Sequence, residues 1–255
     1  MDDQRLRLSR RGALGALAAL SVARRALAFG QDGAFHPRLL RTGSAAPSEA
    51  HRSGTARWSW ELIRRTSAPA RLSASDVAAD DSALLDEPFT VWIGGTALAP
   101  LSEPEIRGLR RYLALGGVLF VDDSNPATGE FGKSAKLELQ RVLPQSPSIR
   151  LPPQHVLYKS YYLIERPRGR VEGPPYLEAI VSGKELRVVF SAHDLLGALA
   201  RSQDEGWTFA VEGDMQQREL AIRLAVNLAM YVLCLDYKDD QVHAEELMRR
   251  RGRQR

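Results

Sequence analysis

The stretch 102–123 constrains the fold more than any other part of the sequence. Ser102 and Glu105 have the spacing of a capping box, so a helix begins here, and its apolar residues recur at helical intervals. Gly116 and Gly117 end this helix, because glycine readily adopts the conformation that closes a last turn. The uninterrupted apolar run 118–121 comes next, and such runs are typical of strands buried on both faces of a parallel sheet.

A β-rich run at 89–93 precedes the capped helix and completes a strand–helix–strand unit. Parallel units of this kind have a right-handed crossover in nearly all proteins. The sequence therefore predicts an α/β fold with a parallel sheet.

Other segments of the chain supply further elements for one α/β domain. The patterns predict a strand at 35–41, a loop at 42–56, a helix ending near Arg65 with Trp58, Leu62 and Ile63 on one face, a helix at 134–143 with Leu137 and Leu139 apolar, a β-hairpin at 176–191 and a last helix at about 216–235. Asn227 lies on the apolar stripe of that last helix. Because a buried amide must find hydrogen-bond partners, we expect Asn227 to tie the helix to a neighbouring loop.

The first 28 residues have the three parts of a bacterial export signal: a charged start, a short apolar core and small residues before a cleavage point. Arg10 and Arg11 directly precede the core, as in twin-arginine signals, so we expect export to the periplasm. The domain organisation that follows is a signal at 1–28, one α/β domain at 29–237 and an Arg-rich tail at 238–255. The alternative for the first segment is a basic amphipathic surface helix.

Charge and composition exclude several classes of protein. The net charge of +4 comes from the two ends, since residues 29–247 carry 24 basic and 29 acidic side chains. Proteins that bind nucleic acids concentrate positive charge on a folded face, so we expect no nucleic-acid partner. No apolar run reaches the ~18 residues of a transmembrane helix. One cysteine excludes a disulfide framework and a cysteine-based zinc cluster.

Several segments together resemble an exported bacterial family described only as a domain of unknown function, DUF4159. They are the run RRYLALGGVLFVDDSN at 110–125, LQRVLP at 139–144, HVLY at 155–158 and LAVNLAMYVL at 224–233, and the resemblance extends from Phe35 to Leu233. It implies the class I glutamine amidotransferase-like fold, a flavodoxin-like three-layer sandwich. It implies no activity, because none is established for the family. The chain departs from its relatives at Arg57, which stands where they tend to carry aspartate, at Val156, where they tend to carry proline, and between Asp194 and Trp207, where a compact Asp-Gly-Trp segment is stretched.

Amidotransferase chemistry needs a cysteine on an exposed strand-to-helix turn with a histidine base nearby. The single cysteine, Cys234, lies instead in the apolar last helix, where we expect it to pack in the core. The sequence therefore argues against this chemistry.

Asp122 and Asp123 occupy the place where such a nucleophile would stand, at the carboxyl end of a central strand. Gly94, Gly95 and Thr96 end a neighbouring strand, and doubly wound sheets bind ligands at such ends. Adjacent carboxylates bind hard cations or act as general bases. The alternative is that they only cap the next helix or brace the loop.

His193 and Asp194 follow another apolar strand at the same predicted edge, and His155 is a further candidate. Histidine with several carboxylates suits a divalent metal or acid–base catalysis, but no spacing matches a known metal motif, and we predict no metal or cofactor. A serine hydrolase using Ser124 or Ser191 is disfavoured, because neither serine lies in a Gly-x-Ser-x-Gly turn. Trp207, in a polar loop, is the best tryptophan candidate for a binding surface.

These observations favour an exported, non-catalytic binding or assembly domain of the cell envelope, with a protein partner there. Candidate ligand-contacting residues are Gly94, Gly95, Thr96, Ser124 and Trp207. The alternative is a hydrolase or metal-dependent enzyme that uses Asp122, Asp123, His155, His193 and Asp194.

Overall fold

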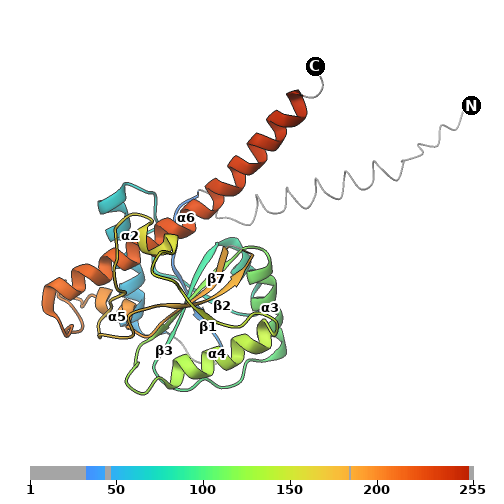
Figure 1. Ribbon diagram of the computed structural model, residues 1–255. Helices are drawn as coiled ribbons and strands as arrows, with labels where there is room; N and C mark the ends of the chain where they lie inside the picture. The colour runs from blue at the N-terminus through green and yellow to red at the C-terminus, as the bar shows by residue number, and fades with distance from the viewer. Residues whose placement is uncertain (1–32, 44–46, 184, 253–255) are drawn as a thin grey trace, which may run out of the picture.

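The computed structural model describes residues 33–43, 47–183 and 185–252, and the predicted signal at 1–28 lies outside them. Within these ranges, seven strands form one sheet in the order β2-β1-β3-β4-β7-β6-β5 (Figure 1). Neighbouring strands from β2 to β7 are parallel, whereas the pairs β7–β6 and β6–β5 are antiparallel. The strands are β1 (Arg38–Arg41), β2 (Asp76–Ala78), β3 (Phe89–Gly94), β4 (Val118–Asp123), β5 (Ile149–Arg150), β6 (Glu178–Ser182) and β7 (Glu185–Ser191).

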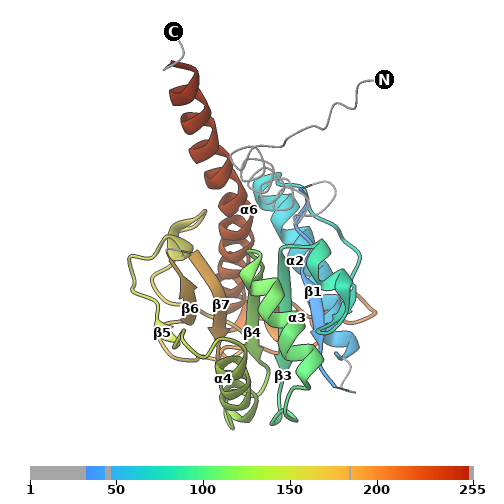
Figure 2. The ribbon, with the colours of Figure 1, turned by 90° about the vertical axis from the view of Figure 1, so that its right-hand side faces the viewer.

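Helices cover both faces of the sheet (Figures 1 and 2). One face carries α2 (Glu49–Thr66), α5 (Leu195–Leu199), α6 (Asp214–Gly252) and the 3-10 helix η2 (Val156–Lys159), and the other carries η1 (Ser82–Asp86), α3 (Glu103–Ala114) and α4 (Glu130–Val142). Each layer has its own apolar core, centred on Trp58 and Phe120 on the first face and on Trp92 and Leu109 on the second. The molecule is a three-layer α/β sandwich whose parallel strands follow the flavodoxin-like order.

The capped helix and its two strands form as the sequence predicts. The Ser102 side chain accepts a hydrogen bond from the Glu105 N–H, and Glu105 accepts one from the Ser102 N–H at 2.8 Å, which is a complete capping box at the start of α3. The helix packs closely against the start of β4. A Cβ on Gly117, the residue before β4, would lie only 2.4 Å from the Tyr112 ring of α3. The Tyr112 hydroxyl donates to the Pro88 carbonyl at 2.8 Å, so α3 is held against the start of β3.

The structure differs from the sequence-based expectation at several elements. The expected loop at 42–56 is wrong in its second half, because α2 begins at Glu49 behind a Ser48 cap. Strand β2 and helix α5 are short elements that the sequence pattern did not reveal. Ile63 and Leu137 are exposed rather than on the buried faces of their helices. The hairpin formed by β6 and β7 is confirmed. The last helix is confirmed as an element, but it continues to Gly252, past its expected end at about residue 235.

Cys234 lies on α6 with its side chain exposed, so the expectation that it packs in the core is wrong. The buried stripe of α6 includes Tyr231 and Val232, and the helix then continues past the sheet (Figure 2). The thiol therefore lies where α6 leaves the body of the domain, not on a strand-to-helix turn.

No helix in the part of the chain that the structure describes is both long and apolar enough to cross a bilayer.

Candidate functional site

The order of the strands reverses at β1, and a pocket of about 190 Å³ lies at this point. The chain passes from β1 to β2 on one side and then to β3 on the other, and the segments that follow β1 and β3 lead to α2 and α3 on opposite faces of the sheet. Leu40 and Thr42 line the pocket from β1 and the residue after it, and Trp92 and Gly94 line it from β3. Doubly wound sheets bind their ligands at such a switch point.

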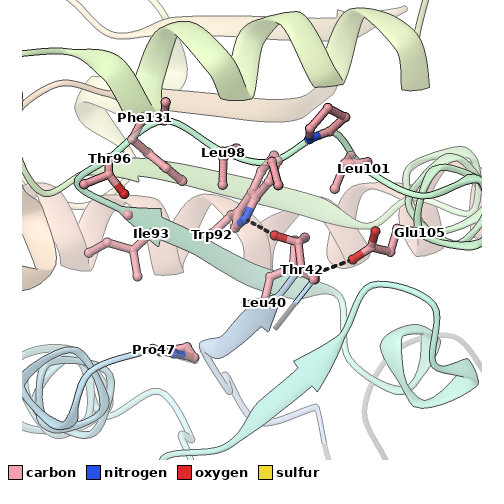
Figure 3. A pocket seen from close by; sticks show the side chains of 15 residues that line it. Leu40, Thr42, Pro47, Trp92, Ile93, Thr96, Leu98, Leu101, Glu105 and Phe131 are labelled. Carbon is pink, nitrogen blue, oxygen red and sulfur yellow. Dashed lines mark hydrogen bonds between the residues drawn. The ribbon is translucent and has the colours of Figure 1, made fainter. Parts of the chain in front are cut away.

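The pocket wall is mainly apolar, with polar groups at its two ends. Figure 3 shows Thr42 and Glu105 at one end, Trp92 in the middle, and Thr96 with Phe131 at the other end. Trp92 Nε1 donates to Thr42 Oγ1 at 3.3 Å, and the Gly43 N–H donates to Glu105 Oε1 at 2.6 Å. Among the described residues that line the pocket, Glu105 alone carries a charge.

Glu105 both caps α3 and holds the segment that follows β1. Burial on its own would raise the pKa of Glu105, but hydrogen bonds from Gly43 and Ser102 outweigh burial and lower this pKa below its usual value. Glu105 is therefore ionised at neutral pH and adds negative charge to the pocket wall. The sequence identified Glu105 only as a cap, because its contact with Gly43 joins residues far apart along the chain.

Two of the predicted rim residues line this pocket, namely Gly94 and Thr96. Close packing against Phe131 requires glycine at position 94, because a Cβ there would lie 2.4 Å from the Phe131 ring. Two other predicted rim residues, Gly95 and Ser124, lie beside each other. A Cβ on Gly95 would be 2.8 Å from Ser124 Oγ. Neither Gly95 nor Ser124 contributes to the lining.

Asp122 caps helix α5. Its carboxylate accepts from the N–H groups of Leu195 at 3.0 Å and Leu196 at 2.8 Å, and the side chain is fully buried. Burial, reinforced by the charge of Asp194, raises the pKa of Asp122 to about 8. These contacts engage both carboxylate oxygens with backbone groups that a helix start leaves unpaired.

Asp194 caps the same helix, since it accepts from the Gly197 N–H at 3.0 Å and forms an ion pair with Arg170. Its backbone has a φ of 52°, the left-handed conformation that asparagine and aspartate tolerate better than most residues. Burial raises the pKa of Asp194, and the ion pair with Arg170 limits this rise. Both carboxyls therefore resist ionisation, and the ion pair with Arg170 favours the charged form of Asp194.

Asp123 supports the other layer of the sandwich. Successive side chains of a strand point to opposite faces, and Asp123 accepts from the N–H groups of Asn125 at 2.9 Å and Gly132 at 3.1 Å. Gly132 lies in the first turn of α4, whose own N-cap residue, Gly129, has no side chain to offer. The adjacent aspartates thus cap two helices on opposite faces of the sheet.

His193 is buried beneath the segment 169–174. Its Nε2 lies 2.8 Å from the Pro174 carbonyl oxygen and donates to it, because a carbonyl can only accept. Gly169 packs against the backbone of His193, since a Cβ on Gly169 would lie 2.1 Å from the His193 carbonyl oxygen. Burial lowers the pKa of His193 to about 4, with a further contribution from the charges of Arg168 and Arg166. The imidazole is therefore neutral at physiological pH and packs as a structural group.

His155 lies near the other end of the sheet. Its Nδ1 accepts from the Leu157 N–H at 3.2 Å, and its ring centroid is 5.9 Å from that of Tyr231. The Tyr231 hydroxyl accepts a hydrogen bond from the Leu186 N–H at the amino end of β7. Five strand residues, roughly 16 Å, separate Leu186 from the carboxyl end of β7. The structure therefore does not bring His155 together with the aspartates.

The described residues contain no group of three or more His, Cys, Asp or Glu side chains arranged to hold a metal ion. A family model described as a domain of unknown function (DUF4159) matches residues 38–233. The chain belongs to the DUF4159 family. No curated protein matches it. The matched range contains all of β1 to β7, so the pocket and both helix caps are parts of the DUF4159 domain.

Asn227 joins helix α6 of this DUF4159 domain to a loop, as the sequence predicts. Its Oδ1 accepts from the Tyr162 N–H at 2.7 Å, and its Nδ2 donates to the carbonyls of Leu157 at 3.0 Å and Tyr162 at 2.8 Å. The side chain is fully buried. Every polar contact of this amide is with backbone, so Asn227 has a structural role.

Trp207 is the predicted surface candidate of the DUF4159 domain, and it is half-buried between arginines. The guanidinium carbons of Arg218 and Arg201 lie 4.2 Å and 4.4 Å from its ring centroid. Arg57 lies 5.2 Å from the same ring and 3.9 Å from that of Trp60. Trp207 lies away from the pocket, and the predicted rim therefore divides into separate regions.

Proposed function

We propose that this protein is an exported, non-catalytic binding component of the bacterial cell envelope, with an amidotransferase-like fold and a ligand site in the pocket between β1 and β3. The observation that supports this proposal is the division of Asp122 and Asp123 between two helix starts. Because both carboxylates accept backbone N–H groups on opposite faces of the sheet, they do not form one reactive centre. The switch point itself presents an apolar wall.

The size and charge of the pocket indicate the class of ligand. Pockets for drug-sized molecules enclose about 300–1,000 Å³, whereas this one encloses about 190 Å³. That volume suits one side chain of a peptide or a small molecule of similar size. Trp92 and Phe131 favour an apolar group, and ionised Glu105 disfavours an anion.

The binding site is tested by nuclear magnetic resonance on the full chain with two small probes. We expect N-acetyl-leucine amide to bind with a Kd in the millimolar range, about what so small a ligand achieves, and to shift the amide signals of Gly43, Gly94 and Thr96. We expect N-acetyl-aspartate to shift none of them, because Glu105 repels it.

A pocket-filling variant supplies the control for this experiment. Ala97 is exposed on the pocket wall, so Ala97→Trp should fill the space and abolish the shifts, whereas Ala74→Trp, on an exposed loop elsewhere, should leave them unchanged. Unchanged shifts in Ala97→Trp, or shifts centred on α5, would show that the pocket is not the site.

Export is tested separately through the paired arginines. Twin-arginine transport depends on both guanidinium groups, so we expect Arg10→Lys combined with Arg11→Lys to leave the protein in the cytosol. Cell fractionation and immunoblotting measure the distribution, with Arg24→Lys and Arg25→Lys as the matched control. A double variant that still reaches the periplasm contradicts the twin-arginine route.

A further inference from the structure

Five side chains from α2 and from the segment between α5 and α6 form a continuous surface that the pocket does not include. We call it the arginine–tryptophan surface, and its members are Arg57, Trp60, Arg64, Arg201 and Trp207, with Arg218 of α6 buried beneath them. Figures 1 and 2 show α2 and α6 side by side on one face of the sheet. Arg57 bridges the two rings, and the Arg64 guanidinium lies 5.0 Å from the Trp60 ring centroid.

This surface carries positive charge that the neighbouring carboxylates balance only in part. Within the described ranges, Arg64, Arg201 and Arg218 have no carboxylate oxygen within 4 Å, whereas Arg57 pairs with Glu61. The acidic groups nearby have other partners or offset this charge only in part. Glu61 also pairs with Arg65, and Glu219 pairs with Arg65 and Arg223. Asp204 accepts from the Ser202 hydroxyl and is attracted to Arg201 without forming an ion pair with it.

Arg218 adds a buried charge beneath the surface. It is only 3% exposed, donates to the carbonyls of Ala198 and Phe209, and has an Nε with no hydrogen-bond partner. Burial lowers the pKa of Arg218, and the charge of Arg201 lowers it further. The fold therefore holds like charges against Trp207, an arrangement that an external anion would relieve.

The residue types indicate a protein partner rather than a polyanion. Tryptophan and arginine are enriched among the residues that dominate binding energy at protein interfaces. Both rings are half-buried and held in place by guanidinium groups, so binding orders few side chains. Residues 29–247 carry five more acidic than basic side chains, which disfavours a long polyanion or an anionic membrane but leaves a short acidic segment attracted locally.

We propose that the arginine–tryptophan surface docks a short acidic segment of a partner protein, whose carboxylates pair with Arg64 and Arg201 and whose apolar side chains contact Trp60 and Trp207. This proposal extends the proposed binding function by naming a partner class and a second surface. Its residues are not shared with the pocket, so the two proposals fail independently.

The test uses the full chain and a fluorescein-labelled octapeptide of alternating glutamate and leucine. We expect saturable binding by fluorescence anisotropy that weakens as salt rises, because charge pairing carries part of the affinity. We also expect the indole N–H signals of Trp60 and Trp207 to shift, while those of the buried Trp58 and Trp92 stay in place. Absence of binding, or binding without these indole shifts, overturns the proposal.

Matched double variants separate this surface from general charge effects. Arg64→Gln with Arg201→Gln should weaken peptide binding about tenfold or more, because it removes both accessible unpaired cations. Arg107→Gln with Arg111→Gln removes the same charge from exposed positions on α3, across the sheet, and should have little effect. Equal losses in the two double variants overturn the proposal.

Two further arms distinguish the pocket and other anions. Ala97→Trp should bind the peptide as the parent does, even where it has lost N-acetyl-leucine amide. Heparin and phosphatidylglycerol vesicles should bind more weakly than the peptide, and stronger binding of either to the same residues would replace the protein partner with a polyanion or a membrane.

Discussion

Asp122→Ala is expected to lower the free energy of unfolding by about 3 kcal/mol, because it leaves two buried backbone N–H groups at the start of α5 without an acceptor. Each such group costs about 1–3 kcal/mol, and removal of the buried carboxyl relieves part of this loss. Urea unfolding followed by circular dichroism measures the change. Peptide binding at the arginine–tryptophan surface, assayed below the unfolding transition, should change little.

The raised pKa of Asp122 also predicts how stability changes with pH. The folded pKa of Asp122 is raised to about 8, above 3.8 in the unfolded chain, so the folded state retains a proton that the unfolded chain releases. The contribution of Asp122 to stability is therefore fully present below pH ~4 and declines as the pH rises toward 8. Asp122→Asn cannot ionise and should remove this decline.

Comparison of Asp122→Asn with the parent at pH 5 and pH 9 tests the assignment. We expect the variant to be less stable than the parent at pH 5, because the amide has only one acceptor oxygen for two backbone N–H groups. At pH 9 we expect it to gain stability relative to the parent. A functional carboxylate that must ionise would give the opposite result. Asp122→Ala would then lose no stability, and both variants would lose activity.

Asn227→Ala is expected to cost about 3–4 kcal/mol, because three hydrogen bonds to the loop that contains η2 are lost at a fully buried position. The Tyr162 N–H and the carbonyls of Leu157 and Tyr162 lose their partner, and the missing side chain leaves a cavity. Asn227→Asp provides the matched control. It keeps the acceptor for Tyr162 but places a carboxylate against two carbonyls, so we expect it to be at least as destabilising.

Thermal melting with backbone hydrogen exchange measures the effect and locates it. Exchange should rise first at Leu157 to Tyr162, since these residues depend on the amide for their position. A loss below about 1 kcal/mol, or protection that is unchanged in this loop, would contradict the structural role of Asn227.

Elements with local signals were predictable from the sequence, and elements defined by distant contacts were not. The α3 cap depends on Ser102 and Glu105 alone, three residues apart, and it was predicted correctly. The start of α2 was missed because its sequence is rich in small residues, which allow close packing against α5, a helix far away along the chain. A Cβ on Gly54 would lie 2.9 Å from the Leu196 carbonyl oxygen, so close approach to α5 requires glycine there.

The candidate site shows the same division. The sequence placed Asp122 and Asp123 correctly at a strand end, and their alternation across the sheet follows from the strand repeat of two. The partners of these carboxylates, Leu195 and Gly132, are determined by the tertiary fold and have no sequence signal. The pocket was predictable as a switch point once the strand order was known, but the contact between Gly43 and Glu105 was not.

The two outermost strands of the sheet are its shortest, since β2 has three residues and β5 has two. A foreign strand that added to either edge would find only one or two backbone groups to pair with, too few for stable β-augmentation. Short edges of this kind also resist aggregation between copies of the same chain. We therefore expect a partner of this domain to be recognised through side chains on helices and loops, where specificity can change without disturbing the backbone hydrogen bonds of the sheet.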